Sequence, residues 1–149
     1  MTFFVIEKLP AVIDWHRADI IPINNHITLG QRCRFVAGDF FQLIQSKTGF
    51  DPDNACRRFH AILVDIDHSP KQWLAPANSF FYQKNGLTAI NQHPLPGHVF
   101  GLWSNDAPDV TFTNRLALAV GKADAIPITF ENSLIGTTET QTVYLARMP

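Results

Sequence analysis

The sequence has few cysteines, little net charge and no long apolar run, and each shortage excludes a class of protein. Its two cysteines, Cys33 and Cys56, do not form a Cys-x-x-Cys pair, and no His-x-x-x-His spacing occurs, so no metal site is expected. The formal net charge is -1 at pH 7, which gives no bulk attraction to nucleic acid or an anionic membrane. No apolar stretch approaches the roughly 18 residues of a membrane-spanning helix.

The composition is typical of a globular protein. Hydrophobic residues make up 46% of the 149 residues and charged residues 17%, which is enough apolar material for one core. We therefore expect a single domain over residues 1–149. Glu7 and Lys8 directly follow the first short apolar run, which is unlike a secretory signal, so a cytoplasmic location is expected.

Short apolar runs alternate with segments of helical periodicity along the chain. The expected strands span residues 3–6, 34–37, 60–64, 99–103, 125–130 and 142–146. The expected helices span residues 10–16, 79–90 and 110–120, with a further short helix starting at residue 40. The first strand is apolar throughout, which predicts burial on both faces, and the third is expected to be the most strongly buried strand of the chain. A polar segment, residues 47–54, is expected to be a surface loop.

This order of elements predicts an α/β fold with a mostly parallel sheet, because strands that alternate with helices form parallel crossover units. The last two strands lack an intervening helix and are expected to form an antiparallel hairpin.

Acidic residues follow several of the expected strands. They are Glu7, Asp39, Asp65 with Asp67, and Asp106 after Ser104 and Asn105. Ligands of open α/β sheets bind at the carboxyl ends of the strands, and a carboxylate can hold a ribose diol, an amino group or an ammonium ion. Each residue could instead cap the helix that follows it. Several acids at one sheet edge together favour a binding site.

Four runs, in this order and spacing, resemble the spermidine synthase family and its uncharacterised relatives. They are Gly38-Asp39-Phe40-Phe41, HAILVDIDHSP at residues 60–70, Phe81-Tyr82 with Gly86-Leu87, and PGHVFGLWS at residues 96–104. The resemblance covers nearly the whole chain. It implies a partial Rossmann-like fold of the class I S-adenosylmethionine-dependent methyltransferase type. It also implies transfer of an aminopropyl group from decarboxylated S-adenosylmethionine to an amine.

The resemblance assigns a cofactor-binding set near the N-terminus. Glu7 matches the acid that holds the ribose hydroxyls of the nucleoside. Asp39, directly after Gly38, matches the residue that meets the adenine amino group. The co-substrate would be decarboxylated S-adenosylmethionine or S-adenosylmethionine, and no tightly bound cofactor is expected.

The resemblance also assigns a catalytic set. Asp65 matches the acid that helps to accept the proton of the attacking amine, and Tyr82 matches an aromatic residue near the polyamine channel. The family's Asp-x-x-Asp-Pro pattern is not present, because Ser69 precedes Pro70. Asp67 could substitute for the second acid.

The glycine-rich turn and the first core strand of the family have no counterpart before Glu7. We therefore expect a truncated chain with impaired activity. The alternatives are a non-catalytic nucleoside-binding or assembly module and an S-adenosylmethionine-dependent methyltransferase. The gap left by the strand would be closed by direct pairing of strands 3–6 and 61–65 or by a second copy, which favours a homodimer. The expected ligands are a nucleoside and a polyamine, with no nucleic acid and no membrane.

Overall fold

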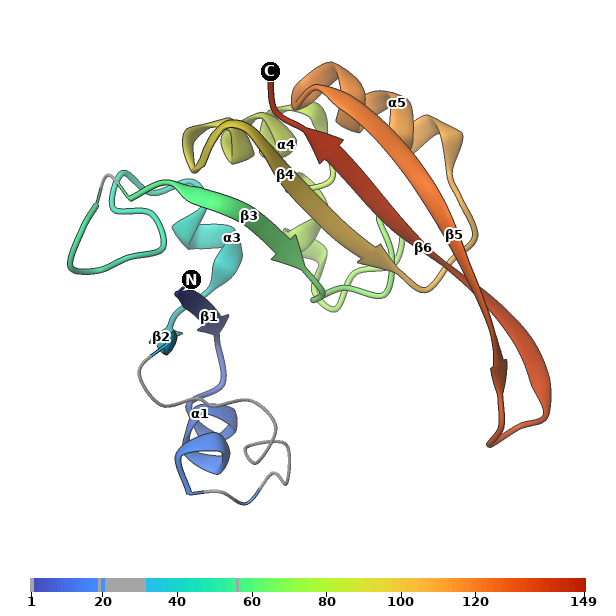
Figure 1. Ribbon diagram of the computed structural model, residues 1–149, viewed down its shortest axis with the longest axis horizontal. Helices are drawn as coiled ribbons and strands as arrows, with labels where there is room; N and C mark the ends of the chain where they lie inside the picture. The colour runs from blue at the N-terminus through green and yellow to red at the C-terminus, as the bar shows by residue number, and fades with distance from the viewer. Residues whose placement is uncertain (1, 19, 21–31, 56) are drawn as a thin grey trace. The chain divides into compact units, whose positions relative to one another are not determined.

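The computed structural model describes residues 2–18, 20, 32–55 and 57–149, so Cys56 lies outside the described residues (Figure 1). The chain divides into two compact units, Met1–Arg57 and Arg58–Pro149. The single domain expected over residues 1–149 stays a prediction, and each unit is described by itself below.

The first unit is a small parallel β/α structure. Its elements are β1 (Phe3–Glu7), α1 (Pro10–Arg17), β2 (Cys33–Ala37) and α3 (Phe40–Leu43). β1 and β2 pair in parallel, from Phe3 opposite Cys33 to Glu7 opposite Ala37. Pro10 starts α1. A backbone N–H at this position has no partner within the helix, so the lack of one in proline costs no hydrogen bond. All four elements lie within two residues of the predicted positions.

Two burial predictions for the first unit were wrong. Phe3 and Val5 of β1 are 50% and 38% exposed, so one face of β1 is not buried. Residues 47–54 form no regular element, as predicted, but Phe50 and Asp51 within them are buried. Phe50 stacks on Phe40, with ring centroids 5.4 Å apart, so this segment contributes to the core of the unit.

The second unit contains the four-stranded sheet. Its elements are β3 (Phe59–Val64), η1 (Pro76–Phe80), α4 (Lys84–Ala89), η2 (Ile90–Gln92), β4 (Pro94–Ser104), α5 (Val110–Ala119), β5 (Lys122–Asn132) and β6 (Thr137–Arg147). The strand order is β3-β4-β6-β5. β3 and β4 are parallel, whereas β6 is antiparallel to both β4 and β5. The predicted parallel crossover and the closing hairpin are both confirmed.

Helices α4 and α5 lie behind the four-stranded sheet in Figure 1 and cover one of its faces. The core between them is aromatic: Phe81 packs on Phe100, and Phe112 packs edge-on against Tyr144 at 4.9 Å. The prediction that β3 is the most strongly buried strand was wrong, because β4 is buried over more of its length. Ile62 and Val64 are buried, but Leu63 is 77% exposed, because no helix of this unit covers its face.

The helix predicted over residues 79–90 is divided into η1, α4 and η2. Gly86 explains the break, because a β-carbon at this position would lie 2.3 Å from the Phe80 carbonyl oxygen and 2.5 Å from the Phe81 α-carbon. The start of α4 is therefore folded back onto the backbone of η1. No helix among the described residues is long and apolar enough to cross a membrane.

Candidate functional site

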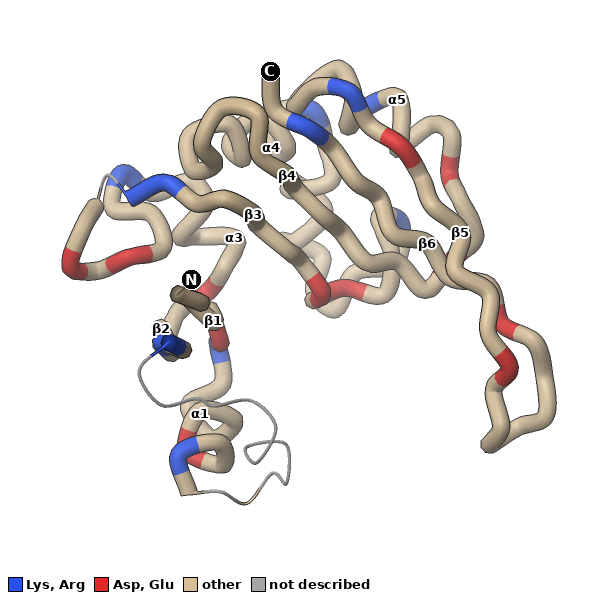
Figure 2. Tube along the Cα trace, in the orientation of Figure 1, with Lys and Arg blue, Asp and Glu red and all other residues tan. Residues whose placement is uncertain are grey.

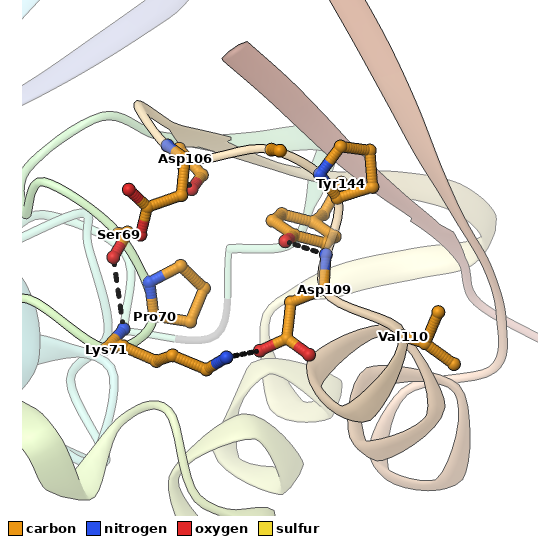
Figure 3. A pocket seen from close by; sticks show the side chains of 10 residues that line it. Ser69, Pro70, Lys71, Asp106, Asp109, Val110 and Tyr144 are labelled. Atoms are coloured by element: carbon orange, nitrogen blue, oxygen red, sulfur yellow. Dashed lines mark hydrogen bonds and ion pairs between the residues drawn. The ribbon is translucent and has the colours of Figure 1, made fainter. Parts of the chain in front are cut away.

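A hollow of about 170 Å³ lies at the carboxyl ends of β3 and β4 in the second unit (Figure 3). Three segments form it: the turn after β3, the loop from β4 into α5, and β6. Its lining residues are Ser69, Pro70, Lys71, Ser104, Asp106, Ala107, Pro108, Asp109, Val110 and Tyr144. The location is the one at which open α/β sheets bind ligands.

The turn after β3 is anchored by Asp67, which is 5% exposed. Its carboxylate accepts hydrogen bonds from the Leu74 N–H at 2.7 Å, the Asn78 amide at 2.8 Å and the Tyr82 hydroxyl at 2.9 Å. Burial, together with the Asp67 carboxylate, raises the pKa of Tyr82, so this hydroxyl keeps its proton and donates it. The anchor holds the turn that forms one wall of the hollow.

Ser69 sets the position of Lys71 on that wall. The Ser69 side chain is buried, and its hydroxyl oxygen accepts hydrogen bonds from the N–H groups of Lys71 and Gln72, both at 3.2 Å. The Lys71 ammonium extends across the mouth of the hollow to Asp109, with Nζ 2.8 Å from Oδ2 (Figure 3).

The opposite wall is the N-terminus of α5. Asp109 caps this helix by accepting hydrogen bonds from the N–H groups of Thr111 and Phe112, at 2.8 and 3.3 Å. The hydrogen bond from the Lys71 ammonium is the main cause of the lowered pKa of Asp109. The Asp109 N–H in turn donates to the buried Tyr144 hydroxyl at 2.9 Å. Burial raises the pKa of Tyr144, so its own proton stays available at the hollow.

Asp106 and Asp65 are the acids with unused carboxylates in this part of the chain. The backbone of Asp106 is fixed by Ser104 and Thr142, and its side chain points into the hollow (Figure 3). Asp65, in the turn after β3, is exposed. Among the described residues, neither carboxylate has a hydrogen-bond or ion-pair partner. Asp106 lines the small polar hollow and Asp65 does not, and a carboxylate in such a hollow suits a protonated amine.

The structure brings the predicted cofactor-binding residues together at the carboxyl ends of β1 and β2. The Gly38 N–H donates to the Glu7 carbonyl at 3.0 Å, and the Glu7 side chain accepts from the Leu9 N–H at 2.7 Å. Asp39 caps α3 and pairs with Lys8 at 2.8 Å, and that hydrogen bond lowers its pKa. Asp39 thus has the capping role considered as its alternative, and nucleoside binding stays a prediction.

The predicted catalytic residues separate into two groups. Asp65 is open to solvent, whereas Asp67 and Tyr82 bond to each other and are buried, with Tyr82 0% exposed. The pair holds the wall of the hollow in place, and its contact with substrate stays a prediction. Among the described residues, no group of three or more His, Cys, Asp or Glu is arranged to hold a metal ion.

Sequence reasoning missed Lys71, Asp109 and Tyr144. A usable signal existed for Asp109, because an acid directly before an expected helix is a preferred N-cap. Tyr144 reaches the hollow through the register of β6 against β4, in which Tyr144 lies opposite Leu102. That register is a tertiary property without a local sequence pattern.

No protein-family model matches the sequence, and no curated protein sequence matches it. Solved structures do match. A spermidine synthase from Thermotoga maritima superimposes with a TM-score of 0.67 at 12% identity, over 99% of this chain and 46% of that chain. A spermidine synthase in complex with the transition-state analogue AdoDATO superimposes with a TM-score of 0.64 at 12% identity, over 99% of this chain and 45% of that chain.

A third similar structure is the N-methyltransferase NodS from Bradyrhizobium japonicum, in complex with S-adenosyl-L-homocysteine. It gives a TM-score of 0.59 at 14% identity, over 99% of this chain and 67% of that chain. The chain spans about half the length of the spermidine synthases that it matches. The chain therefore has the Rossmann-like α/β fold that spermidine synthases and S-adenosylmethionine-dependent methyltransferases share.

Proposed function

We propose that the chain is a transferase of the polyamine aminopropyltransferase type, with the acceptor amine bound in the hollow at the ends of β3 and β4. The observation that carries this proposal is the Asp106 carboxylate, which points into the hollow and accepts no hydrogen bond from the described residues. The fold, shared with spermidine synthases, supports the same reaction class.

The size and charge of the hollow suit a short aliphatic amine. A volume of about 170 Å³ holds roughly five or six water-sized groups, since one water occupies about 30 Å³ in the liquid. Asp106 would accept hydrogen bonds from the ammonium. Lys71 pairs with Asp109 and also lies within electrostatic reach of Asp106, so these three groups together leave one net negative charge, which matches one cationic end of an acceptor.

In the proposed reaction, the nitrogen of the neutral amine attacks the aminopropyl carbon bonded to the sulfonium of decarboxylated S-adenosylmethionine. The new C–N bond forms as the C–S bond breaks, and the bonding pair leaves with sulfur as methylthioadenosine. The amine must lose one proton, and Asp65 is the exposed carboxylate proposed to accept it. The remaining contribution of the protein is to position the two reactants.

Nucleoside binding is proposed for Glu7, Gly38 and Asp39 of the first unit. Glu7 would hold the ribose hydroxyls and Asp39 the adenine amino group. Because Asp39 already caps α3 and pairs with Lys8, we expect methylthioadenosine to bind with a dissociation constant no better than about millimolar, roughly 4 kcal/mol. Micromolar affinity by calorimetry would contradict this assignment.

A methyltransferase is the second candidate, and the similarity to NodS supports it. A methyl group and an aminopropyl group leave from the same kind of sulfonium, so the acceptor site proposed here would serve either reaction. Mass spectrometry of the amine after incubation with each co-substrate distinguishes them, because the added masses differ. If no addition occurs but amine and nucleoside both bind, the non-catalytic binding module is the better description.

The amine site is tested by titrating the chain with putrescine in a calorimeter. Binding should weaken about tenfold in Asp106→Asn, because the charge-assisted hydrogen bond is lost. The matched control is Asp124→Asn on β5, which changes the net charge equally but lies outside the hollow. The neutral isostere 1,4-butanediol should not bind. Equal affinity of both variants for putrescine would refute the assignment of Asp106.

A further inference from the structure

Three buried hydroxyl groups line the hollow, and each already uses its oxygen as an acceptor. They belong to Ser69, Ser104 and Tyr144, which are at most 1% exposed, and we call them the hollow hydroxyls. Each accepts a hydrogen bond from a backbone N–H: Ser69 from Lys71 at 3.2 Å, Ser104 from Asp106 at 3.3 Å and Tyr144 from Asp109 at 2.9 Å. A hydroxyl that accepts in this way still has its own proton to donate.

Buried hydroxyls of the second unit that do not line the hollow have an acceptor for that proton. The Tyr82 hydroxyl donates to the Asp67 carboxylate at 2.9 Å, and the Thr142 hydroxyl donates to the Asp106 carbonyl at 2.8 Å. Among the described residues, by contrast, none accepts the proton of a hollow hydroxyl. Because a buried donor without an acceptor is costly, a molecule within the hollow is expected to supply one.

The charge of the hollow limits what this acceptor can be. Lys71, Asp106 and Asp109 together leave one net negative charge, which a single ammonium balances. A second ammonium would lie in the same small space as Lys71 and would be repelled by it. A carboxylate would leave the net negative charge of the hollow unbalanced. The group that accepts from the hollow hydroxyls is therefore expected to be a neutral oxygen.

We propose that the hollow prefers a short amino alcohol, with its ammonium at the Asp106 carboxylate and its oxygen accepting a hydrogen bond from the Tyr144 hydroxyl (Figure 3). Tyr144 is assigned because the Asp109 N–H fixes its hydroxyl through the shortest of the three contacts. An alcohol oxygen accepts two hydrogen bonds, so a serine hydroxyl can contribute the second. This assignment rests on the amine site proposed above, because Asp106 holds the ammonium.

Calorimetry with a matched pair of amines tests the role of Tyr144. The unaltered chain should bind 4-aminobutan-1-ol about tenfold more tightly than pentan-1-amine, which carries a methyl group in place of the hydroxyl. In Tyr144→Phe this preference should disappear, while the affinity for pentan-1-amine stays the same. The matched control is Thr88→Val on α4, which removes a hydroxyl outside the hollow and should keep the preference. Circular dichroism checks that both variants are folded.

The comparison of amines in the unaltered chain does not depend on the folding of any variant. Equal affinity for 4-aminobutan-1-ol and pentan-1-amine would overturn the role of the hollow hydroxyls and leave the amine site in place. Tighter binding of putrescine than of 4-aminobutan-1-ol would overturn the preference for a neutral oxygen, and so would a preference that survives in Tyr144→Phe overturn the assignment of that residue. If none of the amines binds, the proposed function itself fails.

Discussion

Replacing Asp67 by alanine should destabilise the second unit strongly. The substitution removes the acceptor of three hydrogen bonds, from the Leu74 N–H, the Asn78 amide and the Tyr82 hydroxyl. Tyr82 is fully buried, so its hydroxyl would lose a charged partner without access to water, at a cost of about 2–3 kcal/mol. The two other donors lie nearer the surface and should cost about 1 kcal/mol each.

The expected loss is therefore roughly 4–5 kcal/mol of the free energy of unfolding, a large part of the 5–15 kcal/mol typical of a domain. Urea unfolding followed by circular dichroism measures it, with Asp124→Ala on β5 as the control. In a double-mutant cycle with Tyr82→Phe, the coupling between the two sites should be about 1–2 kcal/mol.

The same variants separate anchoring from direct substrate binding. If Asp67 anchors the turn, Asp67→Ala lowers stability, and the effect depends on Tyr82. A loss below about 1 kcal/mol, with no coupling to Tyr82, would refute the anchoring role. Weaker amine binding at unchanged stability would instead restore the contact with substrate predicted from the sequence.

Three further predictions concern packing, the ion pair and acid stability. Gly86→Ala should destabilise the fold by about 3 kcal/mol or more despite the higher helix propensity of alanine, because the new methyl group would overlap the backbone of Phe80; denaturant unfolding measures this. Lys71→Ala should strengthen putrescine binding by up to about fivefold in calorimetry, since the weak exposed ion pair with Asp109 no longer competes for the acidic wall. Burial raises the pKa of Asp51, but hydrogen bonds from the Asp53 N–H and from Arg57 outweigh this effect and leave the pKa below its ordinary value. A lowered pKa in the folded state stabilises the fold fully only at pH values above the unfolded-state pKa. The melting temperature should therefore decrease as the pH is lowered past about 4, and this decrease should be smaller in Asp51→Asn.

The order of strands and helices was predictable because it rests on local periodicity. The antiparallel pairing of β5 and β6 followed from the short connection between them, and it is confirmed. The division of the helix over residues 79–90 was not predictable, because it depends on the contact of Gly86 with backbone six residues earlier. The exposure of Leu63 was missed because an apolar run does not reveal which face of a strand is covered by helices.

The candidate site was predictable where topology determines it. Parallel strands bring their carboxyl ends to one sheet edge, which identified the neighbourhood of Asp106, whereas Asp65 does not line the hollow. Tyr144 could not be found in this way, because it enters the hollow through the pairing of β6 with β4. Lys71 depends on a turn held by a buried serine, and its direction follows from hydrogen bonds rather than from spacing along the chain.

An NMR titration of the ¹⁵N-labelled chain with putrescine tests most directly whether the hollow binds an amine. Amide signals of Lys71, Asp106 and Asp109 should shift in a saturable way, and the shifts should be much smaller with 1,4-butanediol and in Asp106→Asn. Signals of the Asp124 control position should stay in place. Shifts that are spread over the acidic residues of the whole chain, or that are unchanged in Asp106→Asn, would contradict an amine site at the ends of β3 and β4.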